Sequence, residues 1–391
     1  ATSDDWVMAE EVGSTAPETS SGLYKFNLIQ PQPDDAGWPR PRSGHRTFVD
    51  NDFLYVMGGY TDNPEDTILR ELWKFNLVTH KWTRCTIPEN FPTTLASFAC
   101  HSNGNGSFIV YGGTGIPFGM QLDEIVFMGR VIGDEVQIKT VKPMGSKRGC
   151  YGHVLVYDPV RNITFSVGGT DGTQFKLDVH ALRLNDSTGK WEWEEYATYA
   201  DDIGLYRMEA ILEKDSIYIF GGGTTQRIAS FKTISVFNIE RKVYEIIDTE
   251  PDPDHGHPVG RRCHSLVQWG RQVIIAGGCF DDTRTVLKCV WSFNLDTHVW
   301  RRMDDLPSAV FFHDASITAE GQMYIFGGVS SAPRGRIADL QTLWLGPPTL
   351  FSTALAKMKK ITNVSLSGSE YLLSDRLNIT RHVYSETIQP A

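Results

Sequence analysis

The chain has 391 residues, of which 41% are hydrophobic and 21% charged, and its net charge is −10. This composition is typical of a globular protein, and the 11% of aromatic residues suits sheet packing. The acidic balance argues against nucleic acid as a partner, and no apolar run reaches the roughly 18 residues that a membrane span needs. The sequence therefore predicts neither a nucleic-acid-binding nor a membrane protein.

The six cysteines show no CxxC spacing, and no cleavable secretory segment opens the sequence. We therefore expect free thiols in a reducing compartment rather than disulfides. The predicted localisation is cytoplasmic, with the nucleus as an additional compartment.

The N-terminal part contains two kinds of segment. Residues 1–20 are rich in Ser, Thr and acidic side chains, so they are expected to be disordered. Residues 23–29 then alternate like a β-strand and precede the first of a series of repeats.

A Gly-Gly pair ends a β-branched or aromatic run six times, at steps of 50 to 56 residues. The pairs are Gly58-Gly59, Gly112-Gly113, Gly168-Gly169, Gly221-Gly222, Gly277-Gly278 and Gly327-Gly328. That period is typical of the kelch β-propeller, in which each repeat is a four-stranded blade. The sequence thus predicts an all-β, six-bladed propeller over residues 21–346. Glycine lacks a Cβ, so we expect each pair to lie where backbones crowd near the central channel.

Within each repeat, a histidine is expected to start the innermost strand. The candidates are His45, His101, His153, His264 and His313, with Glu209 in the fourth blade. One histidine per blade places these side chains apart, so a structural role is favoured over a metal site, and no metal or other cofactor is expected. The outermost strands begin with an aromatic residue, except that residues 127–142 of blade two read irregularly.

The sixth repeat ends after Trp344 without an outermost strand. Residues 23–29 are therefore predicted to pair into blade six and close the ring, which removes exposed strand edges.

Strand direction places the loop after each Gly-Gly pair and the stretch before each histidine on the same face. That face collects basic residues and aromatic residues. The basic residues are Arg40, Arg42, Arg46, Lys147, Arg148, Arg207, Arg227, Arg261, Arg262, Arg334 and Arg336. Guanidinium groups form bidentate hydrogen bonds with carboxylate or phosphate, so the cluster predicts an anion or acidic-peptide site. The alternative is that individual arginines only brace the loops.

Beyond Pro347-Pro348 the pattern changes from strand to helix. Thr349 can cap a helix in which Leu350, Ala354, Leu355 and Met358 share an apolar stripe. Residues 347–391 are predicted to form a short α-helical appendage that docks on a partner protein or packs along the propeller.

Two stretches carry a resemblance to a known family. Thr349-Leu350, Ala354 and Met358 resemble the box through which substrate receptors bind elongin C, and a cullin-2 box is expected after it. The runs Val110–Gly119, Arg261–Ser265 and Arg70–Trp73 resemble the kelch-repeat receptors that read protein C termini. The resemblance implies a non-catalytic substrate receptor of a cullin-2–elongin B/C ubiquitin ligase. Such C-degrons often end in glycine or alanine.

When the carboxylate-binding positions of these receptors are matched to this sequence, the resemblance implies that Arg262 is the main residue that holds a terminal carboxylate. Arg207 and Arg227 are secondary candidates, and Arg148 is a further one. The expected walls of the site are Tyr151, Tyr206, Phe118 and Phe312.

Two other functions stay open at this point. A plain kelch scaffold would bind an internal peptide or a cytoskeletal protein without ligase coupling. An enzyme is disfavoured because the mouth offers arginines and aromatic residues rather than clustered metal or radical ligands. The chain's own end, Ala391, could also enter the site of a second copy.

Overall fold

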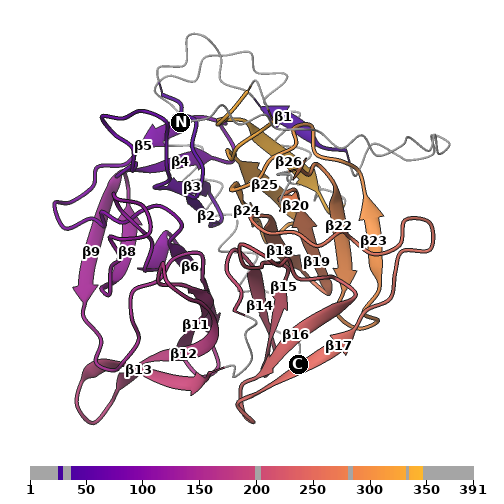
Figure 1. Cartoon of the computed structure of the whole chain (residues 1–391). Coiled ribbons are helices and arrows are strands. Elements are labelled where there is room, and N and C mark those ends of the chain that lie inside the picture. Colours follow the sequence, from indigo (N-terminus) through magenta and orange to yellow (C-terminus); the bar gives the residue numbers. More distant parts are fainter. Residues whose placement is uncertain (1–24, 30–36, 199–203, 281–284, 332–333, 347–391) are drawn as a thin grey trace, which may run out of the picture. The chain divides into compact units, whose positions relative to one another are not determined.

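The computed structural model describes residues 25–29, 37–198, 204–280, 285–331 and 334–346. Regular structure in these ranges is entirely β, arranged as six four-stranded antiparallel sheets and one two-stranded sheet. The innermost strands β2, β6, β10, β14, β18 and β24 contact one another in ring order, which confirms the predicted six-bladed propeller (Figure 1). The described part of the chain contains no helix long and apolar enough to cross a membrane. Both the appendage predicted for 347–391 and the disorder predicted for 1–20 lie outside the described residues.

The blades follow the chain, each running from the innermost to the outermost strand. Blade one is β2 (Arg46–Val49), β3 (Phe53–Met57), β4 (Leu72–Asn76) and β5 (Trp82–Arg84). Blade two is β6 (Ala99–Gly104), β7 (Ser107–Tyr111), β8 (Val126–Ile132) and β9 (Glu135–Val141). Blade three is β10 (Val154–Asp158), β11 (Ile163–Thr170), β12 (Phe175–Asn185) and β13 (Lys190–Ala197).

The second half of the ring repeats this order. Blade four is β14 (Glu209–Glu213), β15 (Ser216–Phe220), β16 (Thr233–Asn238) and β17 (Val243–Asp248). Blade five is β18 (Ser265–Trp269), β19 (Gln272–Ala276), β22 (Val290–Asn294) and β23 (Trp300–Met303), with the small sheet β20 (Cys279–Phe280) and β21 (Thr285–Val286) beside it. Blade six is β24 (Asp314–Ile317), β25 (Gln322–Phe326), β26 (Leu340–Trp344) and β1 (Asn27–Ile29).

The outer half of blade two is regular, although its sequence over 127–142 lacks the aromatic residue that marks most other outermost strands. Strands β8 and β9 pair residue by residue from Val126↔Val141 to Ile132↔Glu135. The tight turn between them uses Gly133 at a φ of 59°. The outermost strand needs an apolar residue only on its inner face, and buried Val136 supplies one in place of the usual aromatic.

The N-terminal strand β1 completes blade six, as predicted. Asn27, Leu28 and Ile29 pair antiparallel with Thr342, Gln341 and Leu340 of β26. Ile29 packs into the core between blades six and one, and Phe26 packs into the core between blades five and six. The first and last described segments are thus held in one sheet, which closes the ring.

The blades are joined at the channel by a closed cycle of six backbone hydrogen bonds, which we call the inner ring. Each blade contributes the residue two positions before its innermost strand, held at a φ of 54–65°. The bonds, donor first, are Gly44–Phe312, Ser97–Gly44, Gly152–Ser97, Arg207–Gly152, Cys263–Arg207 and Phe312–Cys263, with N···O distances of 2.8–3.0 Å. Because the left-handed backbone disfavours side chains, the four non-glycine members are held there at a cost in free energy.

The Gly-Gly pairs pack against this ring, as predicted. A Cβ on Gly112 would lie 2.2 Å from the Cys150 carbonyl oxygen of the next blade, and one on Gly113 would lie 2.0 Å from the Thr94 oxygen. The second glycine of each pair also donates its N–H to the following blade, at 2.7–2.9 Å. Side chains at these positions would therefore push neighbouring blades apart.

The predicted histidine register was wrong in blade two; in blade four Glu209 starts β14 as predicted but does not occupy the place of the histidines. The residue that follows each inner-ring position is the one that packs on the first glycine of the preceding blade's pair. In blade two this residue is Phe98 rather than His101, and in blade four it is Met208 rather than Glu209. The position selects a side chain of suitable volume, so histidine is not required there.

The four histidines that do occupy this position are buried and neutral. Burial lowers the pKa of His313 to about 4 and that of His45, His153 and His264 well below its usual value. The Nε2 atoms of His45 and His313 lie 3.0 and 3.1 Å from backbone oxygens. Their role is thus structural, as the sequence indicated.

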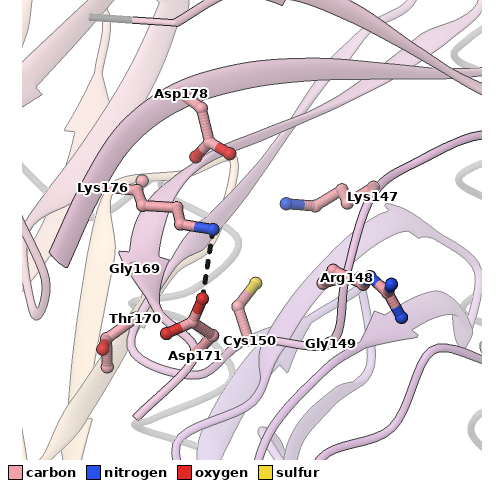
Figure 2. A pocket seen from close by; sticks show the side chains of 10 residues that line it. Lys147, Arg148, Gly149, Cys150, Gly169, Thr170, Asp171, Lys176 and Asp178 are labelled. Carbon is pink, nitrogen blue, oxygen red and sulfur yellow. Dashed lines mark ion pairs between the residues drawn. The ribbon is translucent and has the colours of Figure 1, made fainter. Parts of the chain in front are cut away.

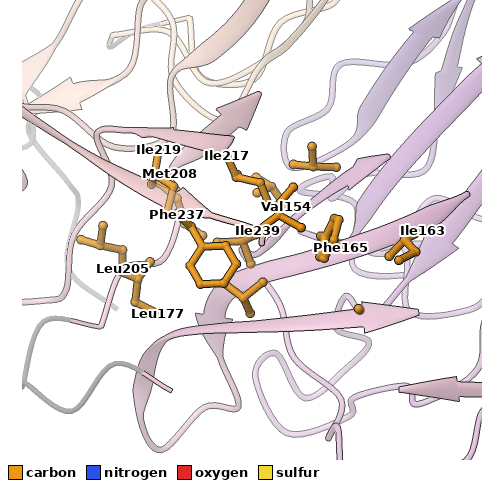
Figure 3. Packing of buried hydrophobic residues seen from close by; sticks show 14 residues of the cluster. Val154, Ile163, Phe165, Leu177, Leu205, Met208, Ile217, Ile219, Phe237 and Ile239 are labelled. Carbon is orange, nitrogen blue, oxygen red and sulfur yellow. The ribbon is translucent and has the colours of Figure 1, made fainter. Parts of the chain in front are cut away.

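Among the described residues, the hydrophobic core has six clusters that each lie between two neighbouring blades, and a smaller seventh cluster that contains Cys263 and Cys279. Figure 3 shows the cluster between blades three and four, where Val154 and Phe165 meet Ile217, Ile219 and Phe237. Phe165, Ile217 and Phe237 are fully buried. Each blade therefore depends on both neighbours for its apolar burial.

Deleting residues 1–29 should destabilise the propeller through the loss of β1. The Phe26 and Ile29 side chains would be lost from two cores, so we expect the free energy of unfolding to fall by about 2–4 kcal/mol. Chemical denaturation measures this change. Deleting residues 1–22 instead keeps β1 and serves as the control, and equal stability of the two truncations would contradict the closing role of β1.

His153→Phe should reduce the acid sensitivity of the fold. Because the pKa of His153 is lowered in the folded state, the unfolded state binds more protons, and stability is lost as pH falls below about 6.5. Phenylalanine already fills the equivalent position in blade two, as Phe98. Relative to wild type, the free energy of unfolding of the variant should rise by up to about 1.4 kcal/mol for each pH unit below that value. Urea unfolding between pH 7.5 and 5 tests this, and parallel pH profiles would contradict it.

Candidate functional site: the propeller mouth

One face of the ring is built from the loops that the sequence grouped together. In every blade the segment before the innermost strand bridges the segment after the Gly-Gly pair. The bridges are Ser43↔Tyr60, Ala96↔Thr114, Tyr151↔Thr170, Tyr206↔Gly223, Arg262↔Cys279 and Phe311↔Val329. We call this face, with the inner ring at its centre, the mouth.

Two of the mouth arginines are structural. Arg42 and Arg261 are fully buried beside the Gly-Gly strands of their own blades. Arg42 donates to Gly58 O at 2.9 Å and pairs with Glu71 at 2.5 Å. Arg261 donates to the Gly277 and Cys289 oxygens at 3.1 and 3.2 Å. These two side chains brace the blades and cannot reach a ligand.

Other arginines are held by nearby carboxylates. Arg40 pairs with Asp66, Arg334 with Asp339 and Arg336 with Asp62. The bracing alternative therefore describes much of the basic cluster.

Three predicted arginines form a basic sector on blades four and five: Arg207, Arg227 and Arg262. Arg262 is half-buried, and its Nη1 donates to the Thr224 oxygen at 2.6 Å, which ties it to the loop after the fourth Gly-Gly pair. Arg227 lies in that same loop and is exposed. Arg207 is an inner-ring residue, and its φ of 60° places its side chain at the channel entrance.

The Arg207 guanidinium is oriented by its neighbours. It lies over the Phe312 ring, 4.4 Å from the centroid, and 5.6 Å from the centroid of Tyr206. Nη2 donates to the Ser97 hydroxyl, while the buried Nε has no partner among the described residues. An acceptor on an incoming anion would satisfy that donor.

Arg148 lies elsewhere, in a small pocket between blades two and three. Its side chain is 81% exposed and approaches Glu124 at 3.7 Å. Figure 2 shows Lys147 pointing into this pocket near Asp178, Lys176 paired with Asp171, and the Arg148 guanidinium pointing away. Arg148 is therefore not grouped with Arg207 and Arg262.

Aromatic rings form a continuous arc over blades one to four. Successive centroids lie 6.2 Å apart for Tyr60–Phe118, 5.5 Å for Phe118–Tyr151, 6.3 Å for Tyr151–Tyr206 and 5.1 Å for Tyr206–Phe175. These spacings are those of interacting rings. Phe118, which is 46% exposed, lies beside the exposed Ile116 and Met120 in the loop after the second Gly-Gly pair. The aromatic arc adjoins the basic sector at Tyr206.

Below the inner ring, an ion-pair cluster fills the channel. Arg46 lies 2.8 Å from Glu209 and 3.2 Å from Asp314, which come from blades four and six. Burial raises the pKa of both carboxyl groups, and the positive charge of Arg46 opposes that rise. The cavity above this cluster has a volume of about 20 Å³, room for little more than one water molecule.

The mouth therefore offers cationic donors beside an apolar wall, above a narrow channel. The described residues contain no group of three or more His, Cys, Asp or Glu side chains that could hold a metal ion. Of the predicted residues, Arg207 and Phe312 line the channel cavity, and Tyr206 lies beside Arg207. Tyr151 and Phe118 continue the arc, and Arg262 is held against the loop that contains Arg227. The predicted elongin-binding residues 349–358 lie outside the described residues.

Sequence reasoning missed Ser97, Phe175, Cys263 and Cys279. Ser97 and Cys263 are inner-ring residues, and aligning the chain on Gly44 and Gly152 would have found them. In blades two and four that alignment was hidden, because Phe98 and Met208 replace the histidine that marks the position elsewhere.

The fold and the mouth define a kelch-repeat propeller of the protein-interaction kind. Comparison with known families agrees: residues 132–328 match the KLHDC2/KLHL20/DRC7 Kelch-repeats domain, and residues 41–88 match the Kelch motif. The chain belongs to the kelch-repeat family.

Several relatives of the chain carry the same name, Kelch domain-containing protein 10. The chain is 34% identical over 342 residues to Kelch domain-containing protein 10 of Homo sapiens, covering 82% of this chain and 74% of the relative. The Rattus norvegicus protein is 34% identical over 360 residues, covering 86% and 84%. The Drosophila melanogaster homolog is 30% identical over 354 residues, covering 80% of this chain and 56% of that protein.

Proposed function

We propose that the chain is a substrate receptor of a cullin-2–elongin B/C ubiquitin ligase and that its mouth binds the C-terminal end of target proteins. The observation that carries this proposal is the junction of the basic sector with the aromatic arc at Arg207 and Tyr206. A protein C terminus has matching chemistry, because its carboxylate can pair with the arginines while the chain that precedes it extends away along the aromatic rings.

The carboxylate is assigned to Arg207 and Arg262. These residues lie on adjacent blades that are joined at the Cys263–Arg207 backbone bond of 3.0 Å. The contact of Arg262 with Thr224 O and the stacking of Arg207 on Phe312 hold both guanidinium groups in place before a ligand arrives. Preorganised donors lose little conformational entropy on binding, which favours affinity.

The narrow channel favours a small terminal residue. The cavity bounded by Ser97, Arg207, Cys263 and Phe312 holds about 20 Å³, so a hydrogen or a methyl group suits it better than a branched side chain. Glycine and alanine are therefore the end residues we expect. Residues further from the terminus would extend along the aromatic arc.

Coupling to the ligase rests on the sequence of the appendage. Thr349, Leu350, Ala354 and Met358 keep the spacing of the elongin C box, and Leu355 extends its apolar stripe. Such a box needs an apolar partner groove to bury that stripe.

A kelch scaffold for an internal peptide is the second candidate. The length of the aromatic arc favours it, since the arc spans four blades and needs no free carboxylate to bind a chain. The two candidates differ in whether the ligand must end in the mouth.

Peptides that end in Gly or Ala with a free carboxylate should bind the propeller, and their amidated forms should not. Loss of the charge-assisted hydrogen bonds removes about 1.5–3 kcal/mol, which weakens binding by about 10- to 150-fold. Arg262→Glu and Arg207→Glu should each give a similar loss, measured by fluorescence polarisation.

Arg130→Glu is the matched control for these variants. Arg130 is exposed on β8, away from the mouth, and its substitution changes the net charge by the same amount. Equal affinity for free and amidated peptides would rule out carboxylate reading and favour the internal-peptide scaffold. Unchanged binding by both mouth variants would show that other residues hold the ligand.

Leu350→Asp and Ala354→Asp should abolish co-purification with elongin B and elongin C, since a buried carboxylate in an apolar interface is strongly unfavourable. Peptide binding by the mouth should be unchanged in both variants. Lys360→Asp, outside the box, serves as the control for charge. Capture of elongins by the two box variants at wild-type levels would contradict ligase coupling.

A further inference from the structure

We propose that Cys263 and Cys279, in the floor of the mouth, form a dithiol that a small peroxide oxidises to a disulfide. This is a modification site rather than a ligand site, and it does not depend on the proposed ligase function. Three observations carry it: the place of both thiols in one apolar cluster beside the Arg262–Cys279 cross-strand pair, the cationic groups around them, and the position of Cys263 at the channel cavity.

The two cysteines are brought together by the backbone of blade five. Arg262 and Cys279 are cross-strand partners that exchange hydrogen bonds of 3.1 and 2.9 Å. Side chains of Cys263 and Cys279 would point to opposite faces of a regular ladder, because they differ by one position in register. Cys263, however, has a φ of 58°, and both cysteines belong to one apolar cluster with Val286, Ala309 and Phe311.

The two thiols lie in one apolar cluster, and the Cys279 thiol donates a hydrogen bond to the Arg262 carbonyl oxygen at 3.7 Å. Hydrogen bonding from the Cys263 thiol, together with the positive charges of Arg262 and Arg207, lowers the pKa of Cys279 to about 7. Burial raises the pKa of the Cys263 thiol, so Cys263 stays protonated. Cys279 is therefore the nucleophile and Cys263 the resolving thiol.

Among the described residues, no other apolar cluster contains two buried cysteines, although the Cys289 sulfur accepts a hydrogen bond from Arg261 at 3.1 Å. Burial raises the pKa of Cys85, Cys100 and Cys150. All six cysteines of the chain are free thiols in the structure. Oxidation should therefore select the Cys263–Cys279 pair.

Access to the pair is limited to small oxidants. Both cysteines are buried, with 6% and 7% exposure; Cys263 lines the cavity of about 20 Å³ at the channel entrance, and Cys279 is reached from there through the apolar cluster that the two cysteines share. Hydrogen peroxide is little larger than the water molecule that such a cavity holds. Bulky alkylating reagents should react with this pair slowly in the folded protein.

The chemistry balances with hydrogen peroxide as the oxidant. The Cys279 thiolate attacks one peroxide oxygen, the O–O bond breaks, and the hydroxide that leaves takes up a proton to become water. Cys279 is then a sulfenic acid. The Cys263 sulfur attacks the Cys279 sulfur and the S–O bond breaks, so the Cys263 proton and the departing hydroxide form a second water. Two thiols have been oxidised and one peroxide reduced.

The disulfide would act on the inner ring. The Cys263 N–H donates to Arg207 O at 3.0 Å, and the Cys263 carbonyl accepts from Phe312 N at 2.9 Å. Any shift of Cys263 toward Cys279 therefore strains both bonds. We expect faster amide hydrogen exchange at Cys263 and Phe312 in the oxidised protein.

The test is peptide mapping of the full chain after treatment with hydrogen peroxide, alkylation under denaturing conditions and digestion with trypsin. Cleavage after Arg262, Arg271 and Arg284 places the two cysteines in separate peptides, 263–271 and 272–284. The expected product is these two peptides joined, two hydrogen atoms lighter than their sum. The other four cysteines should be recovered alkylated.

Cys279→Ser should leave Cys263 unlinked and fully alkylated, whereas Cys100→Ser, in blade two, should still form the link. Matching thermal unfolding of both variants shows that each is folded. The wild-type map stands by itself if either variant fails to fold. Recovery of alkylated Cys263 and Cys279 after peroxide, or links distributed among other cysteines, would overturn the proposal.

Discussion

Six backbone hydrogen bonds around the channel hold this propeller together, and most other features follow from them. Each joins an N–H of one blade to a carbonyl of the blade before it, between residues of left-handed conformation. The close approach leaves no space for Cβ atoms on the Gly-Gly strands, which explains why glycine recurs there. Because the blades bury their apolar faces only against one another, the ring and the six inter-blade cores support each other.

The inner ring also determines what the mouth can present. Gly44 and Gly152 keep the ring unstrained, whereas Ser97, Arg207, Cys263 and Phe312 occupy the same conformation with side chains. A left-handed residue costs of order 1 kcal/mol when it is not glycine, so side chains retained there are candidates for function. These four residues line the cavity at the channel entrance. The basic sector and the thiol pair are both extensions of the ring on blades four and five.

The sequence predicted the fold well because its signals are local. Gly-Gly spacing, strand alternation and hairpin residues reveal the number of blades, the strand order, the closing strand and the face on which the loops gather. The sequence pattern did not identify Phe98 and Met208, because the residue that packs on the Gly-Gly strand is selected by side-chain volume and is a histidine only in the other four blades. The outer strands of blade two looked irregular for a similar reason, since an edge strand needs few buried side chains.

The candidate site shows the limit of such reasoning. From the sequence alone, eleven basic residues share one face, and that much follows from strand direction. Only the tertiary structure separates Arg42 and Arg261, which are buried in the blades, from Arg207 and Arg262 in the basic sector. The reason is physical: a guanidinium group is satisfied by whichever carbonyl or carboxylate lies within reach, and for Arg42 and Arg261 these partners are other segments of the same blade. The sequence determined a six-bladed ring with a basic face, and the folding of each blade decided which arginines stay available to a ligand.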